Sequence, residues 1–221
     1  MSRIEAVLFD IGETLINEGE IYGRWADWLG VPRHTFLTKL GAMLAAGGTA
    51  MDAFEHFRPG FDLAAEERRR AEAGVPNGFG PADLYPDVRD CLAGLRAQGL
   101  LVGAAGNQPV EAAEQFAALG LPMDMVGISD VWGVSKPDPE FFARCAAECG
   151  RPSAAILYVG DRIDNDVRPA LAFGMQVAFL RRGPWGHIQR DEEALRRCAF
   201  VLDDLAALPE LVAARNARRN P

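Results

Sequence analysis

Short, almost uninterrupted apolar runs, separated by longer segments of helical periodicity, limit the fold of this chain more than any other feature of its sequence. A half-exposed strand alternates apolar and polar residues. These runs do not, so both faces of each strand are expected to be buried. Helices on both sides of a parallel sheet produce that burial, and the pattern therefore predicts a three-layer, Rossmann-like α/β core. The expected strands are residues 6–9, 100–105, 125–128, 155–159, 176–180 and 200–202.

The segments between these runs have the spacing and the end signals of helices. In the first of them, Val88, Leu92 and Leu95 fall on one helical face, and Gly99 follows as a stop. The next begins with Pro109 and is followed by Gly120, which is the usual asymmetry of helix ends. The expected core helices are residues 88–96, 109–119, 139–149 and 165–173.

Residues 16–84 interrupt the alternation, because they contain amphipathic helical stretches and no convincing strand. We therefore expect two domains, an α/β core formed by residues 1–15 and 85–221 and a small all-helical domain formed by residues 16–84. The basic tail from residue 213 onward is expected to be a frayed end. Within the insert, the expected helices are residues 20–30, 34–46 and 50–57, followed by a charged stretch at 63–73 and a linker at 74–81.

Charge and composition exclude several classes of partner. The chain has 221 residues, with 31 Asp and Glu against 23 Lys and Arg, and its net charge of −8 would repel a nucleic acid. No apolar run approaches the roughly 20 residues of a membrane span, and the first residues lack the features of a signal peptide. We therefore expect a cytoplasmic protein with no membrane or nucleic-acid partner. The four cysteines lack metal-site spacing and are expected to be packing residues. The oligomeric state cannot be read from this sequence.

Polar residues follow four of the apolar runs, where each predicted strand ends. Asp10 ends the first run, Asn107 follows the second, Lys136 comes after the third, and Asp161 and Asp166 follow the fourth. In an open α/β sheet, ligands bind beyond the carboxyl ends of the strands. The sequence therefore predicts that three carboxylates, one lysine and one asparagine converge on a single site.

Four segments resemble, in order, the four motifs of the haloacid dehalogenase-like (HAD) hydrolase superfamily, most of whose members are phosphatases. The resemblance covers about residues 1–15 and 84–205, and the helical insert takes the place of the family's cap. It implies an Mg²⁺-dependent phosphatase that acts on a small phosphorylated metabolite. The four segments are Phe9-Asp10-x-Gly-x-Thr14-Leu15, Gly106-Asn107, Lys136-Pro137-Asp138-Pro139 and Gly160-Asp161-x4-Asp166.

The chemistry of these residues agrees with that resemblance. A carboxylate such as Asp10 at a strand end can attack phosphorus and form an aspartyl-phosphate. Three carboxylates and Lys136 carry a net charge of −2, which a divalent cation would neutralise, and hard oxygen ligands select Mg²⁺. Lys136 can neutralise the transferring oxygens, and Asn107 can donate a hydrogen bond to them.

The family pattern assigns a role to each matching position. Asp10 and Lys136 are expected to be catalytic, and Gly106, Asn107 and Lys136 to bind phosphate. The metal ligands are expected to be Asp10, Asp161, Asp166 and the backbone carbonyl of Gly12. Asp166 has an alternative, because it could instead cap the following helix or act through water. The histidines lie outside every motif and are expected to have surface or packing roles rather than catalytic ones; they are His34, His56 and His187.

Two positions depart from the family pattern. Most phosphatases of the family carry a second Asp two residues after the nucleophile, which serves as the general acid, and here that residue is Gly12. A positioned general acid is worth about 10²–10⁴-fold. Glu13 is adjacent but is expected to point elsewhere, so a polar residue of the cap, such as His56 or Arg58, or a hydroxyl group of the substrate remains open as a substitute. Gly106 stands where the family usually has Ser or Thr.

These departures leave three functions open. The first is the Mg²⁺-dependent phosphatase, and the second is a catalytically weak member that binds a phosphate ligand or a partner. The third is a 2-haloacid dehalogenase, which needs no general acid because a halide leaves unprotonated. Dehalogenases of the family lack the first acid of the fourth motif, so the presence of Asp161 favours the phosphatase.

Overall fold

A single six-stranded sheet forms the centre of the molecule in the computed structural model, which describes residues 2–218. Every paired strand is parallel, and the order is β3-β2-β1-β4-β5-β6. The predicted α/β class is therefore confirmed, with two of the strands shifted by one residue. The strands are β1 (Ala6–Phe9), β2 (Leu101–Gly106), β3 (Met125–Ile128), β4 (Ile156–Gly160), β5 (Gln176–Leu180) and β6 (Phe200–Leu202).

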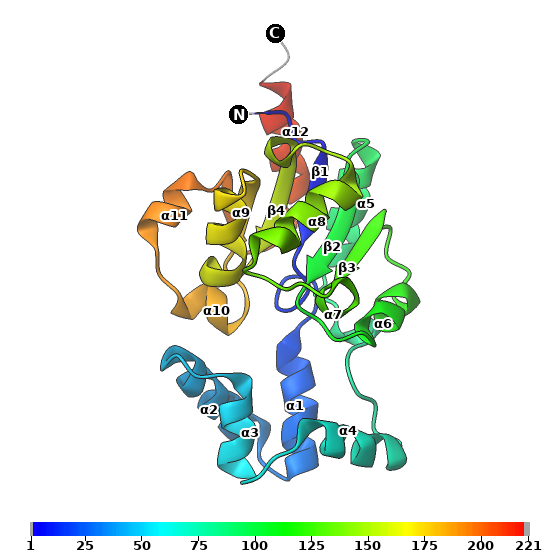
Figure 1. Ribbon diagram of the computed structural model, residues 1–221, viewed down its shortest axis with the longest axis vertical. Helices are drawn as coiled ribbons and strands as arrows, with labels where there is room; N and C mark the ends of the chain where they lie inside the picture. Colours follow the sequence, from blue (N-terminus) through cyan, green and yellow to red (C-terminus); the bar gives the residue numbers. More distant parts are fainter. Residues whose placement is uncertain (1, 219–221) are drawn as a thin grey trace.

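Helices cover both faces of the sheet, which is why the strands are apolar throughout (Figure 1). In β1, Val7 and Phe9 point into one core cluster while Ala6 and Leu8 point into the other. The first face is covered by α5 (Val88–Ala97), α6 (Ala112–Ala118) and α12 (Leu208–Ala217). The second is covered by α8 (Pro139–Cys149), α9 (Arg168–Ala172) and α11 (Glu192–Arg197).

Local end signals fix several of these helices. In α8, the Asp138 side chain accepts from the Glu140 amide at 2.9 Å, Pro139 occupies the first helical position, and Gly150 ends the helix with φ of 59°. The predicted helix 165–173 instead begins as a π-helical turn, η3 (Ile163–Val167), which continues into α9. The remaining short elements of the core are α7 (Ser129–Trp132), η2 (Ser153–Ala155) and α10 (Gly183–Ile188).

The insert between β1 and β2 begins with four helices that have their own apolar cluster, consistent with a cap (Figure 1). Trp25, Phe36 and Phe54 lie at its centre, and Trp185 and Ile188 of α10 pack against it from the core. The helices are α1 (Glu18–Leu29), α2 (Arg33–Ala45), α3 (Ala50–Phe57) and α4 (Leu63–Glu72), and η1 (Pro81–Asp83) follows them.

Helix α4 forms from the charged stretch that the sequence did not assign to a helix. Its polar residues are partly buried because they have partners on α1. Glu66 accepts a hydrogen bond from Trp28 Nε1 at 2.8 Å, and the Arg70 guanidinium lies 3.9 Å from the centre of the Trp25 ring. Charge in this stretch therefore stabilises contact between helices rather than marking a solvated loop.

The expectation of a frayed tail is wrong for the part of the tail that the structure describes. Helix α12 continues to Ala217 because its last turn is bonded to the core. The Asn216 amide donates to the Ile4 carbonyl and accepts from the Ile4 amide, both at 2.9 Å, and Arg215 Nε donates to Gln176 at 3.0 Å. Residues 219–221 lie outside the described residues. Within residues 2–218, no helix has the length and apolar character to span a bilayer.

Candidate active site

The polar residues predicted to converge do meet at the carboxyl ends of β1 and β4, the two strands where the strand order reverses. Asp10 directly follows β1, and its amide donates to the Val159 carbonyl of β4 at 2.8 Å. Asp161 directly follows β4, and Asp166 lies on η3. All three are buried, and one carboxylate oxygen from each lies within 4.8 Å of the others.

Lys136 reaches this acid cluster from the loop that precedes α8. Its ammonium donates to Asp10 Oδ1 at 2.5 Å and to Asp166 Oδ1 at 2.6 Å, and the side chain is only 2% exposed. Burial by itself would lower the pKa of Lys136, but the two carboxylates outweigh it and raise that pKa above its usual value. Lys136 is therefore a permanent positive charge beside Asp10.

Asp161 is the member of the cluster whose bonding is incomplete. Its Oδ2 atom is buried and has no hydrogen-bond partner among residues 2–218. Burial raises the pKa of Asp161 well above its ordinary value, and the charges of Asp166 and Asp10 raise it further. A buried, unpartnered carboxylate oxygen facing two other carboxylates is the donor set that a hard cation such as Mg²⁺ prefers, so these residues fit that ion.

Asp166 has protein partners on both oxygens. Oδ1 accepts from Lys136, while Oδ2 accepts from the Arg162 amide at 2.9 Å and closes the turn that starts η3. This bond runs back to the residue before η3, so Asp166 does not cap the following helix α9, which has no side-chain cap among residues 2–218. Burial raises the pKa of Asp166 to about 6 against the opposing charge of Lys136. Gly160 makes room for it, because a methyl group on its Cα would lie 2.4 Å from Asp166 Oδ2.

Gly106, the last residue of β2, lies beside Asp10, and Asn107 directly follows it. The Asn107 amide donates to the Lys136 carbonyl at 2.9 Å, and its oxygen accepts from the Lys136 amide at 2.8 Å, so it holds the Lys136 backbone. One amide hydrogen remains for a ligand. A methyl group on Gly106 would lie 2.9 Å from Asp10 Oδ1, so a side chain at this position would crowd the Asp10 carboxylate.

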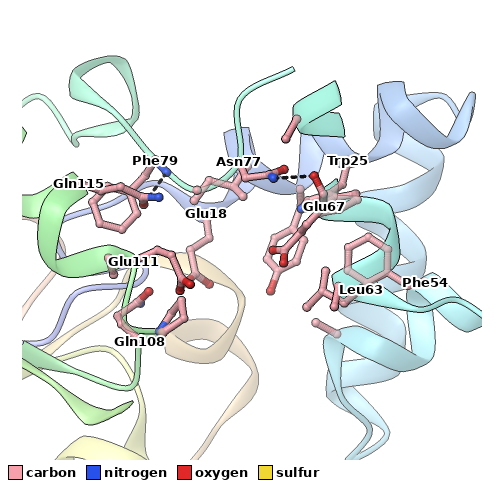
Figure 2. Close-up of a pocket in the computed structure, with 18 of the residues that line it drawn as sticks. Glu18, Trp25, Phe54, Leu63, Glu67, Asn77, Phe79, Gln108, Glu111 and Gln115 are labelled. Atoms are coloured by element: carbon pink, nitrogen blue, oxygen red, sulfur yellow. Dashed lines mark hydrogen bonds between the residues drawn. The ribbon is translucent and has the colours of Figure 1, made fainter. Parts of the chain in front are cut away.

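Two cavities adjoin at this site. The smaller, of about 90 Å³, contains Asp10, Lys136 and Asp161. The larger, of about 670 Å³, lies between the helical insert and the core (Figure 2). Glu18 and Gln108 line both cavities. The small cavity is completed by Gly12, Glu13, Asn107, Arg162, Asn165 and Trp185.

The sequence did not identify Glu18 or Asn165 as site residues, because Glu18 lies outside the recognised motifs and Asn165 is one of the unspecified positions of the fourth motif. Glu18 is the first residue of α1, on the helical insert, and only the folded chain brings it to the core. Burial raises the pKa of Glu18 to about 8, helped by the charges of Glu13 and Asp10.

Glu13 stands in the wall of the small cavity, with its carboxylate already engaged. The Tyr85 hydroxyl donates to Glu13 Oε2 at 2.5 Å. Burial raises the pKa of Glu13, whereas that bond and the charge of Arg182 lower it. Glu13 therefore does not point away from the site, as the sequence led us to expect, but its carboxylate is held by Tyr85.

The candidate cap residues divide into two groups. Tyr22 and Trp25 line the large cavity, and Trp185 lines the small one. His56 is exposed and Arg58 pairs with Glu66 at 2.9 Å, and neither lines either cavity, so the idea that one of them supplies the acid is not supported. The exposed His34 and His187 are also absent from both cavities. All four cysteines are free thiols, which are Cys91, Cys145, Cys149 and Cys198.

This fold and this site together define an enzyme of the α/β class, with an acidic centre fitted to a cation at the switch point of a parallel sheet. The chain belongs to the haloacid dehalogenase-like hydrolase family, whose profile matches residues 4–174.

The relatives include several phosphatases. A glyceraldehyde 3-phosphate phosphatase of Pyrococcus furiosus is 29% identical over 98% of this chain and 96% of its own length. A phosphoserine phosphatase of Thermus thermophilus is 31% identical over 77% of this chain and 72% of its own length. Two further glyceraldehyde 3-phosphate phosphatases, of Methanopyrus kandleri and Methanocaldococcus jannaschii, are 38% and 32% identical, and the matched part of this chain spans 45% and 56% of their lengths.

Solved structures share the fold at low identity. The HAD-hydrolase YfnB of Bacillus subtilis, determined with bound magnesium, superposes with a TM-score of 0.70 at 16% identity, covering 96% of this chain and 99% of that one. The L-2-haloacid dehalogenase of Xanthobacter autotrophicus gives 0.69 at 22% identity, covering 95% and 98%. At these identities the likeness establishes the fold, and the chemistry has to be argued from the residues of this site.

Proposed function

We propose that this protein is an Mg²⁺-dependent phosphatase that hydrolyses a small phosphorylated metabolite through an aspartyl-phosphate on Asp10. The observation that carries the proposal is the placement of Lys136 Nζ, 2.5 Å from Asp10, beside Asp161 with its unpartnered Oδ2. The relatives support it, because by their names they act on phosphate esters such as glyceraldehyde 3-phosphate and phosphoserine.

Asp10, Asp161, Asp166 and the Gly12 carbonyl would hold the Mg²⁺ ion. The bound ion would supply positive charge to a cluster that carries −2 without it, and so would admit a phosphate dianion. Asp161 is the strongest ligand candidate because its free oxygen gains a partner on binding, whereas both oxygens of Asp166 already accept hydrogen bonds.

The chain's own residues account for the attack and for phosphate binding. Asp10 Oδ attacks phosphorus, and the bond from phosphorus to the ester oxygen breaks. Lys136 stays charged through this step and stabilises the negative oxygens of the transferring group. Asn107 keeps the Lys136 backbone in place, and because it lines the small cavity its remaining amide hydrogen would donate to the phosphoryl group.

The large cavity would receive the part of the substrate that leaves. It adjoins the small cavity, and most of its wall is apolar, with Trp25, Phe54 and Phe79 among its lining residues (Figure 2). We propose that residues 16–84 act as the substrate-binding cap, since α1, α3 and α4 supply one side of this cavity. The substrate would thus be a phosphate ester whose leaving group has an apolar portion.

The test is release of phosphate from 4-nitrophenyl phosphate and from a panel containing glyceraldehyde 3-phosphate, phosphoserine and phosphoglycolate, with Mg²⁺ and with EDTA. We expect Mg²⁺-dependent turnover that Asp10→Asn abolishes. Asp130→Asn is the matched control, because Asp130 is an exposed carboxylate just after β3 that lines neither cavity. If no phosphate ester shows metal-dependent turnover, the proposal is wrong, and the alternative of a phosphate-binding member takes its place.

A further inference from the structure

The space beside Gly12 is already filled by a carboxyl group from another element. A methyl group on the Gly12 Cα would lie 2.3 Å from Glu18 Oε1 and 2.8 Å from Glu18 Cδ. Both distances are far below van der Waals contact, so a side chain at position 12 and the present Glu18 conformation exclude each other. The Glu18 carboxyl therefore occupies the volume that an acidic side chain at position 12 would use.

The local fold explains how Glu18 reaches that place. The chain after Asp10 turns tightly, with the Glu13 amide donating to the Ile16 carbonyl at 2.8 Å and the Ile16 amide donating to the Ile11 carbonyl at 3.0 Å. Helix α1 then starts at once, capped by Asn17, whose side chain accepts from the Gly19 amide at 3.0 Å. As a result, Glu18, the first residue of α1, lies next to Gly12.

Glu18 also stands where the two halves of a phosphate ester would join. It lines the small cavity together with Asp10 and Lys136, and it lines the large cavity as well, between the insert and the core (Figure 2). The ester oxygen connects the phosphoryl group to the leaving group, so it has to lie at this junction. Within residues 2–218, the Glu18 carboxyl has no hydrogen-bond partner, whereas Glu13 is bonded to Tyr85.

We propose that Glu18 is the general acid and base of the reaction and replaces the side chain that Gly12 lacks. This inference rests on the proposed phosphatase function. As Asp10 attacks, the ester oxygen keeps the electron pair of its broken bond to phosphorus and takes the proton of the Glu18 carboxyl, so that an alcohol leaves. The Glu18 carboxylate then takes a proton from water, whose oxygen attacks phosphorus. The bond from phosphorus to Asp10 breaks, which releases phosphate and restores the Asp10 carboxylate.

Glu18→Gln tests this role, because it keeps the shape of the side chain and removes its acid. For alkyl phosphates we expect turnover to fall by about 10²–10⁴-fold. With 4-nitrophenyl phosphate, whose leaving group needs no proton, the initial burst of nitrophenolate should persist while the steady state slows, since the phosphoenzyme has lost its base. Mass spectrometry should accordingly find more phosphorylated protein than in the wild type. Glu20→Gln is the control, because Glu20 lies in the same helical turn and is exposed.

A second variant separates a catalytic role from a structural one. Gly12→Asp combined with Glu18→Ala relieves the collision and moves the acid to position 12, so it should recover part of the alkyl-phosphate turnover lost in Glu18→Ala. Equal activity of Glu18→Gln and wild type on alkyl phosphates would overturn the inference and leave the proposed function intact. The inference would also fail if Glu13→Gln, rather than Glu18→Gln, caused the selective loss. Absence of turnover in the wild type on every phosphate ester would instead mean that the proposed function itself has failed.

Discussion

Asp161→Asn is expected to make the metal-free protein more stable, although it removes a residue of the candidate site. Asp161 is 1% exposed, lies beside two other carboxylates, and has one oxygen without a partner among residues 2–218. An amide of the same shape carries no charge, and its hydrogens could donate to the neighbouring carboxylates. The substitution therefore removes a repulsion and adds a donor.

The pH dependence follows from the direction of the pKa shift of Asp161, which burial and the charges of Asp166 and Asp10 raise above the ordinary 3.8. Above pH 3.8 the unfolded state has lost this proton and the folded state still holds it. The metal-free stability therefore falls as pH rises from 3.8 through the folded pKa. A buried polar atom without a hydrogen-bond partner, such as Asp161 Oδ2, costs about 1–3 kcal/mol. We therefore expect Asp161→Asn to gain about 1–3 kcal/mol at pH 8 in EDTA, a rise in Tm of roughly 2–12 °C for a chain of this size.

Thermal unfolding followed by circular dichroism, between pH 5 and 8 in EDTA and in Mg²⁺, measures both parts of this prediction. In EDTA the advantage of the variant should grow with pH. Mg²⁺ at 100 times its Kd should stabilise the wild type by about 2.7 kcal/mol and the variant far less. Asp164→Asn is the control, because Asp164 lies on the same turn but its side chain is 46% exposed and pairs with Arg162. A variant that is less stable than wild type at pH 8 in EDTA, or that gains as much from Mg²⁺, would refute the reasoning.

Three further predictions concern the surroundings of the site. Gly160→Ala places a methyl group 2.4 Å from Asp166 Oδ2, so it should lower the free energy of unfolding by about 1–3 kcal/mol and reduce Mg²⁺-dependent turnover. Its control, Gly41→Ala in α2, has open space around the new methyl group and should raise the free energy of unfolding, measured in urea, by roughly 0.5–1 kcal/mol. Arg182→Ala breaks a buried ion pair with Asp87 and a hydrogen bond to the Thr14 carbonyl, so it should lower the free energy of unfolding by about 3–5 kcal/mol. Arg181→Ala, at the exposed neighbouring position, should lower it by less than about 1 kcal/mol, and similar losses in the two variants would contradict a stabilising role for the buried pair. Burial raises the pKa of Cys91 to about 12 and that of Cys149 to about 11, so a thiol reagent at pH 8 should label the native protein far more slowly than the urea-unfolded one, and fast native labelling of either residue would contradict their burial.

The parts of the site that the sequence predicted are those fixed by strand ends. Asp10, Asp161 and Lys136 follow apolar runs, and parallel strands bring their carboxyl ends to one edge whatever the packing details are. The convergence of these side chains therefore depends only on the parallel topology of the sheet, which the apolar runs predict. Helices α1, α2 and α3 of the insert were likewise predicted because each carries an apolar face.

The features that the sequence missed depend on contacts between distant residues. Helix α4 has a polar sequence, and two of its charged residues are buried against α1. Glu66 accepts a hydrogen bond from Trp28, and the Arg70 guanidinium packs on the Trp25 ring. The last turn of α12 is held by Asn216 against Ile4, 212 residues away in the chain. Glu18 is close to Gly12 in the sequence, but its place in the site depends on the tight turn after Asp10 and on Asn17, the N-cap residue of α1. Neither feature belongs to a recognised motif.

The nucleophilic role of Asp10 is the central claim, and chemical trapping tests it most directly. Borohydride reduces an aspartyl-phosphate to homoserine, and peptide mass spectrometry then locates the modified position. During turnover of 4-nitrophenyl phosphate with Mg²⁺, we predict homoserine at position 10, and none when EDTA replaces Mg²⁺. Trapping at a different residue, or sustained turnover with an unmodified Asp10, would contradict the account.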